Sequence, residues 1–507
     1  MVTELVSRLK CIHNRFGAGA RLAVFFMAGL ILSACGGGGS GDSAADSGDV
    51  IIGLTDAEGD FASYTVDVLS LTLTRANGTV VETLPLSTRV DFAQYTDLTE
   101  FLTAATVPSG VYVKGTLVLD YGNADIRVEN AAGEAVTVDN LVDAAGNPLA
   151  QVEVSVRLED RNRLVVAPGV PAHLTLDFDL QASNTVTFDS AGVPTVTVSP
   201  FLLAEVEAQH NKTHRLRGPL KQVDTDAGKF QVYLRPFRHR VADWQRHFGV
   251  LNVFTDSDTV YEIDGIGYQG EAGLAVMDTL PRYSAVVVVG DVRLNPRRFL
   301  ARQVYAGSSV PGGNMDVVRG SVVARSGNSL TVKGATLFRM DGSILFNDTV
   351  TVLLADSTRV GKQLSAEPAD IGDVSVGQRV TVFGFITNPS VEALELDASS
   401  GYLRMELSSV RGARIGVVGI PEQPLPFVVD VVSINGRDVA LYDFTGTGTD
   451  PANDADPDYY EVDGSTLDLS AIVEGSPVAV RGHVRPFGQA PMDFEAWTVV
   501  DRSAVGP

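Results

Sequence analysis

An acidic loop towards the end of the sequence carries closely spaced carboxylates that could serve as metal ligands. Asp454, Asp456 and Asp458 alternate along a segment that also contains two prolines, and Ca²⁺ takes about six to eight oxygen ligands. An EF-hand loop needs glycine at its sixth position and glutamate at its twelfth. This segment has Tyr459 and Ser465 there. We therefore favour a solvated acidic turn, with a weak Ca²⁺ site as the alternative.

One basic and aromatic segment stands out in an otherwise acidic chain. Its guanidinium groups could form paired hydrogen bonds to phosphate or carboxylate, and its indole could stack on a sugar ring. The candidate ligand-binding residues are Arg235, Arg238, Arg240, Trp244 and Arg246. The three- and four-residue spacing of its apolar residues equally indicates a short amphipathic helix that closes one end of a barrel. We favour this plug, and contact with an anionic glycan or a lipid headgroup is the alternative.

The motifs of common catalytic sites are not found in the sequence. There is no G-x-S-x-G, H-E-x-x-H or C-x-x-C pattern, so we predict no catalytic residue. The glycines of residues 265–270 match G-x-G-x-x-G, but the preceding strand alternates apolar and charged residues. A dinucleotide-binding strand is buried on both faces, so we expect these glycines to form a turn. His210 and His214 are interpreted as part of a hydrated linker.

The charge and length of the chain limit its partners and its organisation. It has 507 residues and a net charge of −23 at pH 7, and 45% of its residues are hydrophobic. A field of this sign repels phosphate backbones, so we expect no nucleic-acid partner. The hydrophobic share is sufficient for folding, and the length predicts about three to five domains.

The first 34 residues have the character of a lipoprotein signal peptide. A basic start is followed by the short apolar run Leu22–Ala34, which is too brief for the ~20 residues of a membrane-spanning helix. Leu32, Ser33 and Ala34 precede Cys35 as in a bacterial lipobox, which predicts that the Cys35 thiol is acylated. Residues 35–49 are rich in glycine and serine and indicate a flexible tether. We thus expect a membrane partner through an N-terminal lipid, and a cell-envelope location at the outer membrane.

Residues 50–209 are predicted to form an acidic β-sandwich. Short runs of alternating apolar and polar residues, such as Thr65–Thr74 and Val152–Leu158, are separated by turn signals rich in glycine, proline and asparagine. This spacing is typical of sandwiches. Helical periodicity is scarce, and Asp97–Ala105 is the best candidate for a short helix.

The remaining chain contains an internal repeat. A strongly apolar strand carries a glycine at Gly290, again at Gly384 and again at Gly482. A glycine inside such a strand usually marks a bulge, which allows a small sheet to curl into a barrel.

The starts of the repeated units also resemble one another. Arg217-Gly218 and Arg319-Gly320 match, and Arg411-Gly412 is a weaker third copy. We therefore predict three small β-barrels. Their ranges are residues 215–310, 316–400 and 405–507.

Two family resemblances agree with this organisation. The segments Ile52–Asp60, Val66–Leu73, Val107–Tyr112 and Leu174–Asp179 resemble the lipoprotein family called domain of unknown function 4382, over roughly residues 50–205. Glu58 replaces a proline that is usual in that family, which loosens one turn. The three barrel units are similar to domain of unknown function 5666, which implies an OB-like fold.

These observations together predict an all-β, lipid-anchored envelope protein without enzymatic activity. We expect a binding or structural display module, whose partner would be a polysaccharide or another envelope component such as a lipid headgroup. The alternative is a polysaccharide-active hydrolase or lyase, which would need two carboxylates about 5–10 Å apart in a cleft.

Overall fold

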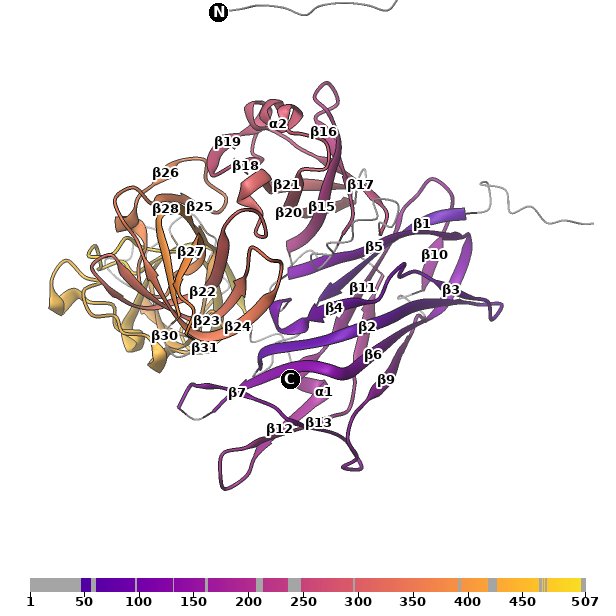
Figure 1. Cartoon of the computed structure of the whole chain (residues 1–507), viewed down its shortest axis with the longest axis horizontal. Helices are drawn as coiled ribbons and strands as arrows, with labels where there is room; N and C mark the ends of the chain where they lie inside the picture. The colour runs from indigo at the N-terminus through magenta and orange to yellow at the C-terminus, as the bar shows by residue number, and fades with distance from the viewer. Residues whose placement is uncertain are drawn as a thin grey trace, which may run out of the picture. The chain divides into compact units, whose positions relative to one another are not determined.

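The computed structural model is built almost entirely of β-strands, as the alternating sequence pattern predicts (Figure 1). It describes residues 47–55, 61–95, 98–130, 132–159, 163–206, 213–235, 248–294, 297–390, 394–417, 426–464, 467, 469 and 472–502. The predicted signal peptide, Cys35 and most of the predicted tether lie outside these residues. No helix of the described residues is long and apolar enough to cross a bilayer.

The N-terminal strands form the sandwich. Its first sheet has the strand order β14-β11-β1-β5, its second has the order β10-β6-β2-β3 with β4, β7 and β9 alongside, and a small third sheet has the order β12-β13-β8. The strands and the short helix are β1 (Ser47–Thr55), β2 (Phe61–Arg75), β3 (Val80–Glu82), β4 (Thr88–Asp91), β5 (Leu98–Pro108), β6 (Gly110–Glu129), β7 (Ala135–Thr137), β8 (Asn140–Asp143), β9 (Gln151–Arg157), β10 (Leu164–Val166), β11 (Ala172–Phe178), α1 (Leu180–Ser183), β12 (Asn184–Phe188), β13 (Pro194–Val198) and β14 (Leu202–Glu205).

The sandwich strands form because their apolar residues fall on alternate positions. In β2, Val66 and Val68 and then Leu71 and Leu73 are fully buried, and the intervening residues are less so. The two pairs are out of phase because the register with β6 shifts between Val68 and Ser70. A strand that keeps one face in the core and one in water requires this periodicity.

The short helix predicted over Asp97–Ala105 is wrong. Strand β5 begins at Leu98 and lies between β1 and β15 (Thr213–Asp224) in the sheet order. Five successive residues from Thr99 onward are buried. Because both neighbours hydrogen-bond to β5 and both faces are covered, the expected strand alternation is lost and the sequence signal resembles that of a helix.

The sandwich and the first barrel share one sheet, in which β5 and β15 are neighbours. Strand β15 pairs in parallel with β5, with Thr213 opposite Leu98 and Arg215 opposite Glu100. Residues of both units share one hydrophobic cluster. The interpretation of His214 as part of a hydrated linker is therefore wrong, because it lies within β15 and is 2% exposed. His210 lies outside the described residues.

The remaining strands close into three five-stranded barrels with the same connectivity. In each barrel the first strand pairs with the second and the fourth, and the third strand pairs in parallel with the fifth. This closed Greek-key arrangement is of the OB type. The barrel strands are β15, β16 (Lys229–Tyr233), β17 (Val250–Phe254), β20 (Ala285–Leu294) and β21 (Arg297–Ala306) in the first; β22 (Asp316–Ser326), β23 (Ser329–Phe338), β24 (Ile344–Leu353), β27 (Arg379–Asn388) and β28 (Glu395–Glu406) in the second; and β29 (Ser408–Val417), β30 (Phe427–Ile434), β32 (Tyr460–Asp463), β33 (Pro477–Val484) and β34 (Phe494–Asp501) in the third.

The repeated glycines form bulges, as the sequence predicts. The pairing register between the fourth and fifth strands shifts at or beside Gly290, Gly384 and Gly482. A Cβ atom at each position would collide with a carbonyl oxygen of the facing strand. Each barrel can therefore bend sharply only where the side chain is absent.

A few short elements decorate the barrels. The G-x-G-x-x-G segment forms a hairpin, in which β18 (Val260–Ile263) pairs with β19 (Ile266–Gln269) and the turn residues Asp264 and Gly265 both have positive φ. This geometry confirms a turn at Gly265, whereas Gly267 lies in β19 and Gly270 begins α2 (Gly270–Thr279). The other elements are β25 (Arg359–Lys362), β26 (Pro368–Ala369) and β31 (Arg437–Asp438).

Candidate functional site

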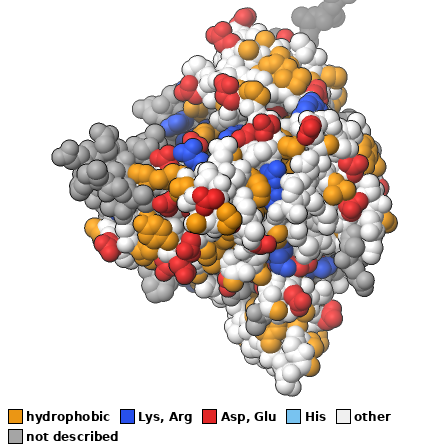
Figure 2. Space-filling model, turned by 90° about the vertical axis from the view of Figure 1, so that its left-hand side faces the viewer, with side chains coloured by type: hydrophobic (Ala, Val, Ile, Leu, Met, Phe, Trp, Pro, Cys, Tyr) orange, Lys and Arg blue, Asp and Glu red, His pale blue; other side chains and the backbone are white. Residues whose placement is uncertain are grey.

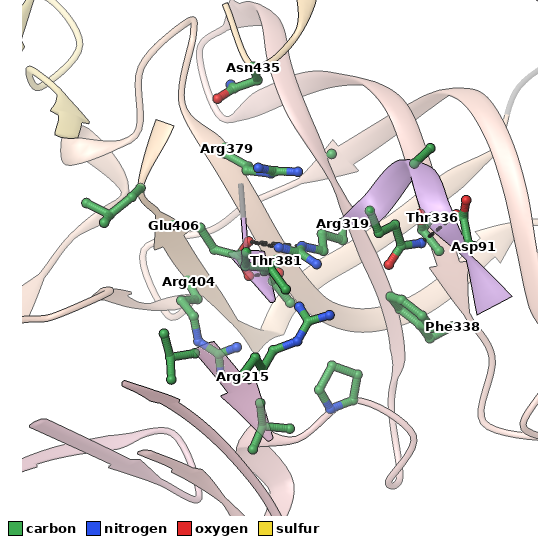
Figure 3. A pocket seen from close by; sticks show the side chains of 18 of the residues that line it. Asp91, Arg215, Arg319, Thr336, Phe338, Arg379, Thr381, Arg404, Glu406 and Asn435 are labelled. Atoms are coloured by element: carbon green, nitrogen blue, oxygen red, sulfur yellow. Dashed lines mark hydrogen bonds and ion pairs between the residues drawn. The ribbon is translucent and has the colours of Figure 1, made fainter. Parts of the chain in front are cut away.

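One cavity of about 1150 Å³ is lined by the sandwich and by all three barrels (Figure 3). The sandwich contributes apolar side chains such as Phe61 and Val186 together with Asp91. The first strand of every barrel also reaches the cavity. The internal repeat therefore positions equivalent strands around a common space.

Cationic side chains dominate the polar part of the lining, and we call this space the arginine cavity. The lining cations are Arg215, Arg217, Arg235 and Arg302 from the first barrel; Arg319, Lys333, Arg339, Arg379 and Arg404 from the second; and Arg411, Arg437 and Arg481 from the third. Among the described residues, the carboxylates that line it are those of Asp91, Glu129 and Glu406. Arginine is the side chain best suited to bind carboxylate or phosphate in two-pronged geometry.

The charge of the arginine cavity is opposite to that of the whole chain, which is −23. On the face drawn in Figure 2, acidic side chains are scattered between apolar and uncharged ones. Five further carboxylates stand behind the cavity lining and pair with lining cations; they are Glu100, Glu262, Asp291, Asp316 and Asp348. With these included, the cations still outnumber the carboxylates by four among the described residues. Positive charge is thus concentrated around the arginine cavity.

In the first barrel, two arginines share one carboxylate. Glu100 on β5 is fully buried, and it forms ion pairs with Arg215 and with Arg217, the second at 3.0 Å. Arg215 is 5% exposed, and its Nη2 has no hydrogen-bond partner among the described residues. Burial, and next the Arg215 cation, lower the pKa of Arg217. One carboxylate cannot neutralise two guanidinium groups, so this wall keeps a positive charge.

In the second barrel, a carboxylate lies among several arginines. Arg319 donates to Glu406 Oε2 from Nε at 2.9 Å and from Nη2 at 2.7 Å, and the Thr381 hydroxyl donates to Oε1 at 2.6 Å. Figure 3 shows the guanidinium groups of Arg319 and Arg379 close to the Glu406 carboxylate. Burial alone would raise the pKa of Glu406, but Arg319, Arg379 and then the Thr381 hydrogen bond lower it to about 2. Glu406 is therefore an ionised acceptor and no proton donor at neutral pH.

The third barrel presents arginines that repel one another. The pKa of Arg411 is lowered to about 10, first by burial and then by the cations of Arg502 and Arg481. A cation that is partly buried and close to other cations is stabilised when an anion approaches.

Buried ion pairs join the units that surround the arginine cavity. Arg404 of the second barrel donates to both oxygens of Glu262 in the first, from Nε at 2.8 Å and from Nη2 at 2.5 Å, and the Tyr402 hydroxyl donates to the same carboxylate. Arg437 next to the third barrel pairs with Glu129 of the sandwich. These contacts fix the walls relative to one another, so the lining arginines are held in place before a ligand arrives.

Of the ligand-binding residues predicted from the basic segment, one reaches the arginine cavity. Arg235 is 8% exposed, lines the cavity, and donates its backbone N–H to Arg217 O at 2.7 Å. The other four, Arg238, Arg240, Trp244 and Arg246, lie outside the described residues, so the choice between a plug and a ligand contact stays a prediction.

The acidic loop contributes nothing to the arginine cavity. Asp454 Oδ1 accepts a hydrogen bond from Gly448 N at 2.8 Å, and Asp456 Oδ1 accepts one from Asp458 N at 3.0 Å. Among the described residues, no three His, Cys, Asp or Glu side chains are arranged to hold a metal ion. The carboxylates of Asp454 and Asp456 thus accept backbone hydrogen bonds within the loop, and the choice between a solvated acidic turn and a weak Ca²⁺ site stays a prediction.

Sequence reasoning missed most of the site because its members are scattered from residue 215 to residue 481. In the sequence, the repeated Arg-Gly pairs indicate a structural repeat and do not by themselves indicate a site. All three of their arginines, Arg217, Arg319 and Arg411, line the arginine cavity. A repeated charged residue inside an apolar barrel strand was the signal that could have found them.

The fold and the site define an all-β protein in which a sandwich and three OB-like barrels enclose a cationic cavity. Residues 47–192 match the family model described as Domain of unknown function (DUF4382). The match covers the sandwich up to β12 and confirms that part of the sequence resemblance. No curated protein matches the chain.

Proposed function

We propose that the protein is a non-enzymatic binding module of the cell envelope whose arginine cavity takes an anionic ligand. The observation that carries this proposal is the gathering of twelve described cations around one cavity, against three lining carboxylates and five more that pair with these cations, in a chain of net charge −23. A protein gains no stability by placing like charges together, so such a concentration indicates a site that an anion completes.

The described geometry supports a preorganised site. Glu100 serves both Arg215 and Arg217, and Arg215 keeps a buried Nη2 without a hydrogen-bond partner. An unsatisfied buried donor costs about 1–3 kcal/mol, which a ligand oxygen would recover. Apolar lining residues such as Phe338 lower the local dielectric constant and strengthen each ionic contact.

Binding of a simple polyanion tests the proposal. We expect inorganic tripolyphosphate to raise the thermal midpoint of the full chain in detergent, and to bind more weakly as ionic strength increases. Arg481→Gln should weaken the affinity measured by calorimetry by about tenfold, because a hydrogen bond to a charged group is lost. This variant should stay folded, since Arg481 repels Arg411.

The matched control is Arg157→Gln, which removes a cation whose side chain is 83% exposed and lies outside the cavity lining. Its affinity for tripolyphosphate should equal that of the unaltered chain. If tripolyphosphate, citrate and sulfate all leave the thermal midpoint unchanged at low ionic strength, the proposal is wrong.

The envelope location rests on the N-terminal sequence, where Cys35 follows a short apolar run as in a lipobox. Lipid attachment there would tether the β-rich unit to the membrane, and we place it at the outer membrane. A Cys35→Ala chain should lose its lipid label and move from the membrane fraction to the soluble fraction. An alanine chain that stays as firmly in the membrane fraction would contradict lipid anchoring and leave the cavity proposal intact.

A further inference from the structure

Three arginines in the arginine cavity occupy the same position of the internal repeat. On the first strand of each barrel, Arg217 pairs with Val287, Arg319 with Thr381, and Arg411 with Ala479. Each partner lies three residues before the bulge glycine of its fourth strand. The register therefore proves the equivalence that the Arg-Gly sequence match suggested, including its weaker third copy.

Equivalent cations from three barrels imply several anion-binding positions in one space. Arg217 and Arg319 each belong to a group in which at least two guanidiniums surround one carboxylate, and Arg411 is repelled by Arg481. The cavity volume of about 1150 Å³ also exceeds the ~300–1000 Å³ typical of sites for small organic ligands. A single phosphate or carboxylate would fill only a small part of it.

Aromatic rings accompany the cations at the cavity surface. Trp497 on β34 lines the cavity with 38% of its surface exposed, and Tyr283 before β20 lines it with 37% exposed. The Tyr283 ring already stacks on Tyr233 at 6.0 Å, and the Arg282 guanidinium lies 4.8 Å from its centre, so Trp497 is the ring that we consider for ligand contact. Exposed aromatic faces beside fixed polar groups are suited to stack on ring-shaped ligand units.

We propose, on the basis of the anion-binding function above, that the ligand is an acidic oligosaccharide that bridges the three barrels. Arg217, Arg319 and Arg411 bind anionic groups on different sugar units, and Trp497 stacks on a sugar ring between them. Carboxylate and phosphate substituents share the two-pronged chemistry that arginine recognises. Either substituent could supply the charges, and the experiment below distinguishes them.

The experiment measures, by calorimetry on the full chain in detergent, how affinity depends on the length and the charge of the ligand. The probes are galacturonate, trigalacturonate, hexagalacturonate, a neutral hexasaccharide, a phosphorylated oligosaccharide of similar length and inorganic tripolyphosphate. We expect affinity to rise by about 100-fold from the single acidic sugar to the hexamer, because linked contacts act together. The neutral hexasaccharide should not bind.

Variants then assign the contacts. Trp497→Ala should weaken hexamer binding by about fivefold or more and leave tripolyphosphate binding unchanged, and Trp497→Phe should restore most of the loss. Arg411→Lys keeps the charge but removes the planar fork, so it should reduce the gain in affinity with length. Tyr459→Ala is the control, since Tyr459 is 51% exposed and outside the cavity lining.

The outcomes separate this proposal from the one on which it rests. Length-dependent binding of galacturonates assigns carboxylated sugars, and tighter binding of the phosphorylated chain assigns phosphorylated ones. If tripolyphosphate binds but no oligosaccharide binds more tightly than its monomer, the oligosaccharide proposal is overturned and the anion site stands. If Trp497→Ala weakens tripolyphosphate and hexamer equally, the ring serves structure and the stacking role is wrong. If no probe binds, the anion-binding function itself fails.

Discussion

At the scale of single residues, two buried carboxyl groups show how surroundings decide charge. Asp493 is 5% exposed and accepts a hydrogen bond from Glu461 N at 2.8 Å. Burial, together with the charges of Glu461 and Asp456, raises the pKa of Asp493 to about 7. Glu406 is also largely buried, but the arginines around it lower its pKa to about 2. Glu406 is therefore ionised at neutral pH, and Asp493 in the third barrel changes charge near neutrality.

Asp493→Asn should change how stability depends on pH. A carboxyl group with a raised folded-state pKa contributes stability below its unfolded pKa of 3.8, and this contribution is lost as pH rises towards about 7. The asparagine chain should lack that decline and be more stable at pH 8, by about 1–4 kcal/mol. Urea unfolding at pH 4, 6 and 8 measures the difference. Parallel pH curves for the two chains would show that Asp493 titrates normally.

At the scale of elements, the repeated glycines predict bulges correctly, whereas the type of an element that is buried on both faces is hard to predict. The repeated glycine correctly predicted a bulge in each barrel because only the absence of a Cβ allows that approach of two strands. By contrast, the helix predicted over β5 is wrong, because a strand that is covered on both faces loses its alternation. Periodicity reports an element only when that element has a wet face.

Gly482→Ala should destabilise the third barrel. Its new methyl group would collide with the carbonyl oxygen of Glu495 on the facing strand, and we expect a loss of about 1–3 kcal/mol in the free energy of unfolding. Gly416→Ala is the matched control, because this glycine lies on β29 of the same barrel and a Cβ there meets no atom within 4 Å. Equal urea midpoints for the two variants would contradict the bulge argument.

At the scale of the whole molecule, sequence predicted the units but not the space between them. Alternation, turn signals and the repeat were local features, so the all-β class and the OB-like barrels could be inferred. The arginine cavity depends on how units far apart in sequence pack, through contacts such as Arg437 with Glu129. Pairings of this kind leave no periodic trace, and an arginine that lines a cavity has the same local sequence as one in solvent.

Glu262→Gln should loosen the junction of the first and second barrels. It would leave Arg404, which is 3% exposed, without its carboxylate partner, and breaking a buried pair costs about 3–5 kcal/mol. We expect a lower thermal midpoint and faster proteolysis between β21 and β22. Glu159→Gln should have almost no effect, because Glu159 is exposed and lies 3.9 Å from Arg157. A thermal midpoint for Glu262→Gln equal to that of this control would contradict the structural role of the pair.

The position of β1 has a mechanical consequence. This first described strand is flanked by β11 in parallel and by β5 in antiparallel orientation. A force that pulls on the chain ahead of Ser47, along the axis of β1, acts on both hydrogen-bond ladders in shear. Many hydrogen bonds must then break together instead of one after another. In a copy held by the chain ahead of Ser47, the two ladders of β1 would therefore resist the drag of flowing liquid.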